Sequence, residues 1–150
     1  MSLDTIIAQL QKTRPFDALP RDALQLIAFS TEERKLAAGE VLFEEGETAD
    51  AGYFVVAGTI TLTTKREGAP RTRTVQPGAL IGELALLTEV ARPTTATATG
   101  KARVLRISRK VFQRVMSEFP NEAVKLRAKL AQRTRSLAKE LAALKVRALS

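Results

Sequence analysis

An acidic residue and an arginine lie nine residues apart in a stretch that is otherwise apolar and rich in threonine, IGELALLTEVARPTTATA (81–98). Gly82 directly precedes the acid, Glu83, and a glycine lets the backbone approach a ligand closely. The ELALL segment that follows is expected to form one turn of helix, whose first N–H groups suit an anion. Arg92 would return across the same pocket as a bidentate fork for a phosphate, while Glu83 accepts from a sugar hydroxyl. The spacing alone is a weak signal and favours an exposed loop arginine and a helix-capping acid, because surface charges are common.

The residue types in the chain exclude several other kinds of chemistry. The sequence has no cysteine and no histidine, so it offers no disulfide, no thiolate or imidazole metal site and no histidine-activated nucleophile. The acid pairs Glu32-Glu33 and Glu44-Glu45 are adjacent, and neighbouring side chains of an extended segment point to opposite sides. We therefore expect a protein that is not an enzyme and that needs no metal or cofactor.

Positive charge is concentrated at the C-terminus. Residues 121–150 carry eight Lys/Arg against two acids, a charge of +6, whereas residues 1–120 carry sixteen against fourteen, a charge of +2. The basic residues are interpreted as a solvated helix face, and direct nucleic-acid binding is disfavoured because no reading element or aromatic stacking platform accompanies them. The chain shows neither a secretory leader pattern nor an apolar run of about 18 residues, so a cytoplasmic protein without membrane contact is expected.

The hydrophobic pattern divides one domain, 1–150, into three parts. Residues 1–30 hold two helical candidates, at 3–11 and 20–29, and residues 31–107 hold short β-type runs separated by glycines. TITLTTK (59–65) alternates strictly, with threonines on one face, as a half-buried antiparallel strand does. A barrel or jelly-roll body with flanking helices is predicted.

Residues 108–148 are expected to form two helices. Ser108 is a candidate N-cap for SRKVFQRVMSEF, which ends at Pro120, and a final helix covers 121 to about 148. Leucines recur at heptad spacing in that final helix, at Leu130, Leu137, Leu141 and Leu144. A helix of this length would overhang a small domain, which favours a homodimer through this seam over packing on the chain's own β-body.

Three segments carry a resemblance to a known family: TRPFDALPRDALQLIAFSTEERKLAAGEVLFEEGETADAGYFVVAGTITL, QPGALIGELALL and RPTTATATGKARVLRISRKVF. Together they resemble the cyclic nucleotide-binding domain family, to which catabolite-activator-type regulators belong, from about residue 13 to 140. The resemblance implies a mainly β fold, an eight-stranded antiparallel β-roll with N-terminal cover helices and a long C-terminal helix. It also places a phosphate-binding cassette at 81–96.

The resemblance assigns roles to individual residues of the cassette. Gly82, Glu83, Leu84 and Ala85 would form the cassette helix, with Glu83 on the ribose 2′-hydroxyl and Arg92 opposite the cyclic phosphate. The residue after the arginine usually donates its N–H to the phosphate, but here it is Pro93, which has no N–H. The hydroxyl of Thr94 or Thr95 would be the substitute.

Other positions depart from the family pattern or are less firmly assigned. Phe43, Gly52 and Ile81 differ from the usual residues and are interpreted as repacking. The lid that contacts the base is expected on the last helix, at Thr134, Leu137 and Ala138.

Two functions remain open on this basis. The first is a cAMP or cGMP sensor that rearranges its C-terminal helices to control an unidentified effector protein. The alternative is a degenerate member that binds no nucleotide and serves as a dimeric interaction or scaffold module, which Pro93 favours. The sequence leaves the choice between adenine and guanine undecided.

Overall fold

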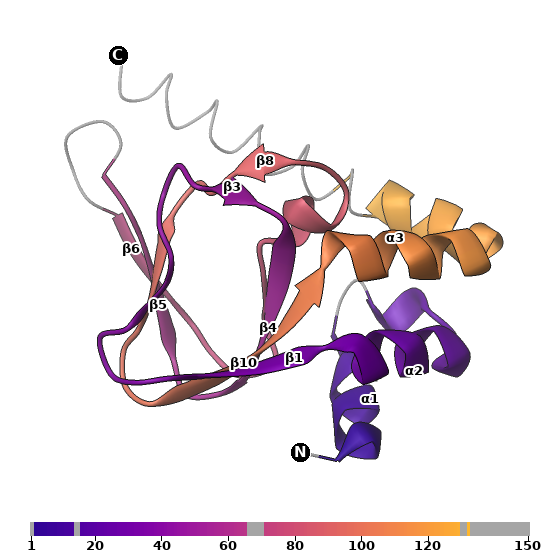
Figure 1. The fold of residues 1–150 in the computed structure, drawn as a ribbon, viewed down its shortest axis with the longest axis horizontal. Helices are drawn as coiled ribbons and strands as arrows, with labels where there is room; N and C mark the ends of the chain where they lie inside the picture. The colour runs from indigo at the N-terminus through magenta and orange to yellow at the C-terminus, as the bar shows by residue number, and fades with distance from the viewer. Residues whose placement is uncertain (1, 14–15, 66–70, 130–131, 133–150) are drawn as a thin grey trace.

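The computed structural model describes residues 2–13, 16–65, 71–129 and 132, and it places helices at one end of a β-body (Figure 1). The helices α1 (Leu3–Gln11), α2 (Arg21–Ser30) and α3 (Arg109–Glu118) pack at this end, with a 3-10 turn, η1 (Phe16–Ala18), between the first two. The helices expected at 3–11 and 20–29 are confirmed. Ser108 caps α3 as expected, because its hydroxyl accepts a hydrogen bond of 3.1 Å from the Val111 amide.

The β-body is a roll made of antiparallel strands. Its strands are β1 (Glu32–Leu36), β2 (Val41–Phe43), β3 (Thr48–Ala49), β4 (Ala51–Ala57), β5 (Ile60–Thr64), β6 (Arg71–Val75), β7 (Leu80–Ile81), β8 (Val90–Ala91), β9 (Thr95–Ala98) and β10 (Ala102–Ser108). One sheet has the order β1-β10-β4-β7, a second has β2-β9-β5-β6, and β3 pairs with β8. The predicted roll is confirmed. The described residues divide it into ten strand segments rather than eight, because turns and register shifts interrupt the ladders.

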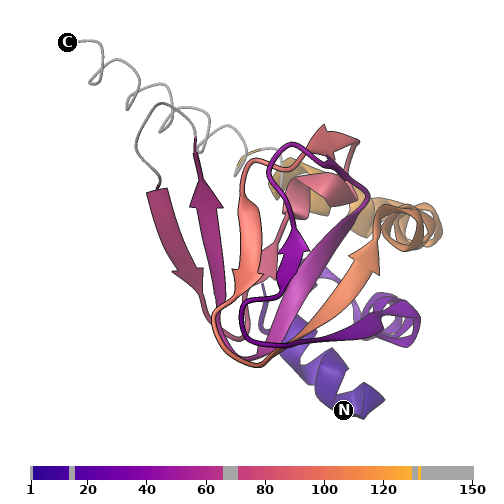
Figure 2. The same cartoon turned by 60° about the vertical axis from the view of Figure 1, so that its left-hand side comes forward.

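The second sheet turns one face toward the interior of the roll. Ile60 is fully buried and Leu62 packs against the interior cluster, whereas Thr61 and Thr63 lie on the opposite face of β5, as the alternation of TITLTTK predicted. β6 is an edge strand of this sheet, and it lies on the left side of the view in Figure 2. The sheet therefore ends in a polar strand that borders the interior of the roll.

Two hydrophobic cores meet at the first sheet. One joins the helices to the side of β4 and β10 that carries Phe54, Leu105 and Ile107. The other fills the roll and includes Phe43, Tyr53 and Ile60 among its buried members. Alternate residues of β4 thus belong to different cores, which explains why this strand reads as a continuous apolar run.

A second C-terminal helix follows α3 directly. Phe119 has φ −127° and ψ 66°, which lies outside the helical region that a following proline disfavours, and residues 120–129 are again helical. Ala123 and Leu126 bury this helix against the helical core. The lid positions Thr134, Leu137 and Ala138 and the seam positions Leu130, Leu137, Leu141 and Leu144 lie outside the described residues. No helix in the described ranges is long and apolar enough to cross a membrane.

Candidate functional site

The segment after β7 forms a short turn that opens on a left-handed glycine. Gly82 has φ +75° and ψ +37°, and the 3-10 helix η3 (Glu83–Leu86) follows it. The first hydrogen bond of the turn joins the Ala85 amide to the Gly82 carbonyl at 3.1 Å. The amides that precede Ala85 in the turn therefore make no hydrogen bond within this helix. The expected helical turn at ELALL is present. Gly82 supplies a backbone conformation that side-chain-bearing residues rarely adopt.

Arg92 directly follows β8 and is held on both sides of its backbone. Its amide donates to the Glu47 carbonyl at 2.7 Å, and its carbonyl accepts from the Gly46 amide at 2.8 Å. The side chain enters the roll and is only 5% exposed. Its guanidinium carbon lies 4.2 Å from the ring centre of Phe43 and 5.5 Å from that of Tyr53. Two aromatic rings therefore set the position of this charge.

The Arg92 guanidinium is only partly used by the protein. Nη2 donates to the Ala51 carbonyl at 2.8 Å, whereas the buried Nη1 has no hydrogen-bond partner among the described residues. A Cβ placed on Gly82 would lie 2.5 Å from Nη1, so this free donor faces the glycine of the cassette. Burial lowers the pKa of Arg92, and nearby acidic groups, Asp50 and Glu47 among them, oppose that shift. A buried cation with an unused donor is the complement of an anion.

Three residues outside the predicted set help to build this arrangement. Phe43 and Tyr53 form the aromatic support, with ring centres 5.9 Å apart. Gly52 brings β4 close to the cassette, because a Cβ there would lie 3.4 Å from the Ile81 carbonyl oxygen and 3.5 Å from that of Gly82. The sequence showed Phe43 and Gly52 only as departures from a family pattern. Their contact with the site depends on strand pairing between segments far apart in the chain.

The residues after Arg92 lie where the chain turns into β9. Pro93 is exposed, and Thr94 is partly buried. The Thr95 hydroxyl accepts a hydrogen bond of 2.9 Å from the Glu45 amide, and Thr95 pairs with Thr63 on the outer face of the sheet. The hydroxyl of Thr95 therefore already fastens the β9 end of the cassette, and a ligand role for either threonine stays a prediction.

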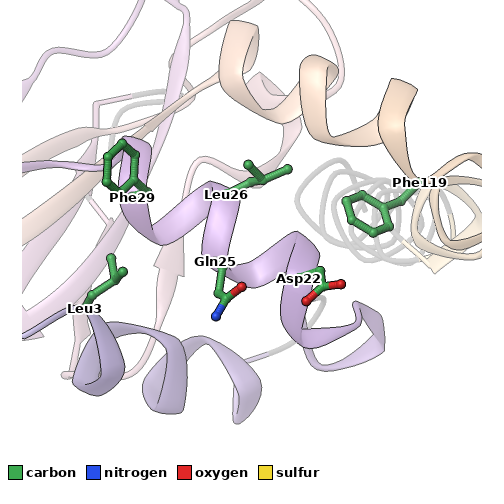
Figure 3. A pocket seen from close by; sticks show the side chains of 6 residues that line it. All are labelled: Leu3, Asp22, Gln25, Leu26, Phe29 and Phe119. Atoms are coloured by element: carbon green, nitrogen blue, oxygen red, sulfur yellow. The ribbon is translucent and has the colours of Figure 1, made fainter.

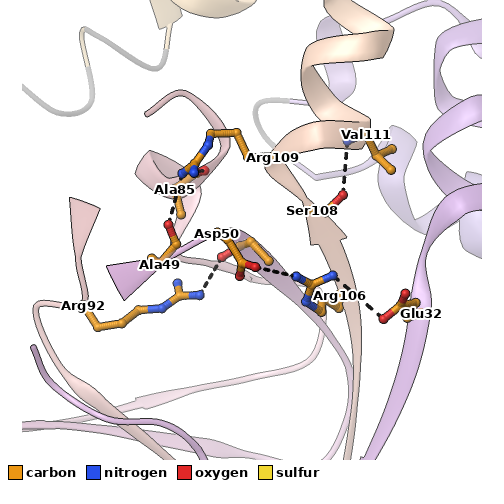
Figure 4. Close-up of polar contacts among 10 residues, drawn as sticks. Glu32, Ala49, Asp50, Ala85, Arg92, Arg106, Ser108, Arg109 and Val111 are labelled. Atoms are coloured by element: carbon orange, nitrogen blue, oxygen red, sulfur yellow. Dashed lines mark hydrogen bonds and ion pairs between the residues drawn. The ribbon is translucent and has the colours of Figure 1, made fainter. Parts of the chain in front are cut away.

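A second arginine joins the cassette to the helices (Figure 4). Arg109, the first residue of α3, donates from Nη1 to the Ala49 carbonyl at 3.0 Å and to the Ala85 carbonyl at 3.3 Å. Its amide also donates to the Asp50 carbonyl at 2.8 Å. Ala85 belongs to η3, so Arg109 links the cassette turn to the start of α3.

The same corner carries an ion pair on its solvent side. The Asp50 carboxylate accepts from Arg106 Nη2 at 2.9 Å. Burial opposes the charge of Arg106, but Asp50 outweighs this effect with the help of other acidic groups, and the pKa of Arg106 is raised. Partly exposed pairs contribute little to stability, so this pair mainly keeps Asp50 in place beside the Arg109 amide.

A separate groove lies at the helical end and is shown in Figure 3. It has a volume of about 460 Å³ and is lined by Leu3, Asp22, Gln25, Leu26, Phe29 and Phe119. Phe29 is 80% exposed there. Phe119 is the residue between the two C-terminal helices, so the shape of the groove depends on the angle between them.

Comparison with known proteins agrees with this geometry. A family model described as "Cyclic nucleotide-binding domain" matches residues 33–119. A solved cyclic nucleotide-binding-like protein from Brucella abortus is 40% identical, with 76% of this chain and 99% of that chain covered and a TM-score of 0.69. The regulatory domain of Toxoplasma gondii PKA, solved with cAMP, is 25% identical over 75% of this chain and 44% of that chain, with a TM-score of 0.71.

A curated relative is much longer than this chain. Lysophospholipase NTE1 of Chaetomium globosum is 31% identical over 134 residues, which are 88% of this chain and 9% of that protein. The match therefore concerns one segment of a large enzyme. On the family model and the solved structures together, the chain belongs to the cyclic nucleotide-binding domain family.

Proposed function

We propose that this protein binds a cyclic nucleotide, cAMP or cGMP, in the roll, with the cyclic phosphate between Arg92 and the cassette turn. The observation that carries the proposal is the buried Arg92 guanidinium, whose Nη1 faces Gly82 without a protein partner in the described chain. Burying a cation without an anion is costly, and a phosphate would offset that cost with a charge-assisted hydrogen bond. The cAMP-bound Toxoplasma domain, which shares this fold, supports the choice of ligand.

The cassette residues would divide the remaining contacts among them. Gly82 lets the Arg92 guanidinium approach the cassette backbone closely, because a Cβ there would lie 2.5 Å from Nη1. Glu83, half-buried at the start of η3, would accept a hydrogen bond from the ribose 2′-hydroxyl. The backbone of Leu84 and Ala85 would complete the cradle around the phosphate.

Ligand binding would be relayed to the helices through two contacts of η3. Leu86 is fully buried in the helical core together with Phe112 of α3, and Arg109 of α3 holds the Ala85 carbonyl. A cassette that closes on a phosphate would therefore pull on α3 and change its angle to helix 120–129. We propose that a partner protein reads this rearrangement, and that the basic final helix forms a homodimer.

Isothermal titration calorimetry with cAMP and cGMP tests the binding site. Arg92→Met keeps an unbranched side chain against Phe43 and Tyr53 but removes the charge, so it should fold and lose saturable binding. Arg114→Met is the matched control, because Arg114 is an exposed residue of α3 and its loss changes the net charge equally. This control should bind as the unchanged protein does.

Thermal unfolding supplies an independent readout of the same variants. A ligand at a hundredfold excess over Kd should add about 2.7 kcal/mol to the free energy of unfolding. Arg92→Met should show no such ligand-dependent gain. Equal stabilisation of Arg92→Met and the unchanged protein would show that the phosphate does not lie at Arg92.

A second candidate function is favoured by Pro93. Without an N–H at this position, the chain would keep its fold and its dimer but bind no nucleotide, and it would act as an interaction module. This alternative predicts neither calorimetric heat nor a shift in melting temperature with millimolar cAMP or cGMP. The same titration therefore distinguishes the two functions.

A further inference from the structure

One face of α2 supplies most of the lining of the groove at the helical end (Figure 3). The lining residues of this helix recur at positions i, i+3, i+4 and i+7, and are Asp22, Gln25, Leu26 and Phe29. Residues at this spacing share one side of a helix, and they cover about 10 Å along its axis. A groove that follows a helix for two turns matches the shape of a second helix.

The groove gathers apolar surface that the described chain leaves uncovered. Phe29 is 80% exposed and Leu3 is 41% exposed. Leu26 and Phe119 pack partly against the helical core and also line the groove. Scattered exposed apolar residues are ordinary, whereas a cluster of them beside a hollow marks a contact site for another molecule. Val124, 68% exposed on helix 120–129, is an exposed apolar residue outside this lining.

The charge around the groove indicates what kind of molecule fits it. Five acidic residues line the groove or lie within three positions of a lining residue, and they are Asp4, Asp22, Glu32, Glu118 and Glu122. Arg21 is the one basic residue within the same limits, so the local charge is −4 on a chain of +8. Asp22 and Glu122 form no ion pair among the described residues. The groove is therefore apolar with an acidic rim on a basic protein.

We propose that the groove binds a basic amphipathic helix of a partner protein, with its apolar side chains against Leu26 and Phe29 and its lysines or arginines toward Asp22. Opposite charges on the two surfaces favour this pairing. A second copy that met this face with its own would oppose like charges across a twofold axis. The inference rests on the proposed function in one respect, because Phe119 is where a nucleotide-driven change of helix angle would alter the groove.

A displayed library of helical peptides is the first probe, offered to the full chain without nucleotide. Peptides of about 18 residues are long enough to be helical on their own. Enriched sequences should carry apolar residues at i, i+3 or i+4, and i+7, together with an excess of lysine and arginine. Enrichment of acidic or uncharged sequences would overturn the inference, and so would the absence of any enriched helix.

Variants locate the contact by fluorescence anisotropy of one enriched, labelled peptide. Phe29→Ala should weaken its binding by about 30-fold or more, as truncation of an aromatic anchor does. Val124→Ala is the matched control and should bind as the unchanged protein does; both side chains are exposed, so neither change disturbs the core. Asp22→Asn should weaken binding by about 2- to 5-fold, and by less in high salt. Unaltered affinity of Phe29→Ala would overturn the inference.

Nucleotide and oligomeric state separate the inference from the function on which it rests. A peptide affinity that changes several-fold when cAMP or cGMP saturates the protein supports the groove as the surface that the partner reads. An affinity that saturating nucleotide leaves unchanged overturns that role, while calorimetric nucleotide binding still upholds the proposed function. If neither nucleotide binds, the proposed function fails, and the groove is judged by Phe29→Ala alone. Conversion of a dimer to a monomer by Phe29→Ala in sedimentation equilibrium would place a second copy in the groove and overturn the inference.

Discussion

Replacement of Gly82 by alanine tests whether the cassette and Arg92 form one site. Gly82 has φ +75°, and its added Cβ would lie 2.5 Å from Arg92 Nη1. The change therefore has two separable consequences, backbone strain and displacement of the guanidinium. Gly78→Ala is the matched control, because Gly78 has φ +95° but a Cβ there meets nothing within 4 Å.

The expected magnitudes follow from these two contributions. A left-handed conformation costs an alanine about 1–2 kcal/mol, so both variants should lose this much stability, or roughly 2–8 °C in melting temperature for a domain of this size. The displaced atom in Gly82→Ala is the tip of a flexible side chain, which can move away. If the movement breaks the bond from Arg92 Nη2 to the Ala51 carbonyl, a further 1.5–3 kcal/mol or so is lost.

Nucleotide affinity distinguishes the variants more sharply than stability does. Loss of one charge-assisted hydrogen bond to phosphate weakens binding by about 10- to 150-fold, and this loss is expected when the added Cβ of Gly82→Ala displaces the Arg92 guanidinium. Gly78→Ala should bind as the unchanged protein does. Calorimetric titration of both variants at a temperature where they remain folded is the assay. An affinity of Gly82→Ala equal to that of Gly78→Ala would refute the placement of the phosphate between Gly82 and Arg92.

Three further predictions address the relay, the proline and the seam. Arg109→Ala should leave nucleotide affinity within a few fold but uncouple the helices, which is measured as loss of the ligand-dependent fluorescence change of a Phe119→Trp reporter in a chain without tryptophan; an unchanged response would place the relay elsewhere. Pro93→Ala should restore an amide donor and raise affinity by about 10- to 150-fold in calorimetry, whereas unaltered affinity would show that the phosphate does not reach this position. Leu141→Glu combined with Leu144→Glu should give a monomer in sedimentation equilibrium, and a persisting dimer would contradict the seam.

The candidate site could be proposed from the sequence only where its residues are local along the chain. Gly82, Glu83 and Arg92 lie within eleven residues, so a glycine, an acid and a base can be read together without knowledge of the fold. The helices α1, α2 and α3 were equally accessible, since capping residues and apolar spacing define their ends locally. Their predicted positions agree with the structure to within one or two residues.

The supporting residues were not accessible in this way, because strand pairing brings them to the site. Phe43 and Tyr53 reach Arg92 from β2 and β4. From the sequence alone, an aromatic residue in a strand is more readily assigned to the hydrophobic core than to a binding site. Antiparallel register decides which of two faces a residue joins, and residue spacing in one strand does not reveal its partner.

The missing N–H of Pro93 is expected to weaken nucleotide binding without abolishing it. The position of Arg92 is fixed by its own amide and carbonyl, which bond to Glu47 and Gly46, and by the rings beneath its guanidinium, none of which involves the Pro93 nitrogen. The loss of one donor, about 1.5–3 kcal/mol, therefore leaves the Arg92 fork in place. Proline also restricts the unfolded chain, which stabilises a compatible turn by about 0.4–1 kcal/mol. A site weakened but preorganised in this way is expected to bind its nucleotide at higher ligand concentration, and so to respond to large changes in nucleotide level.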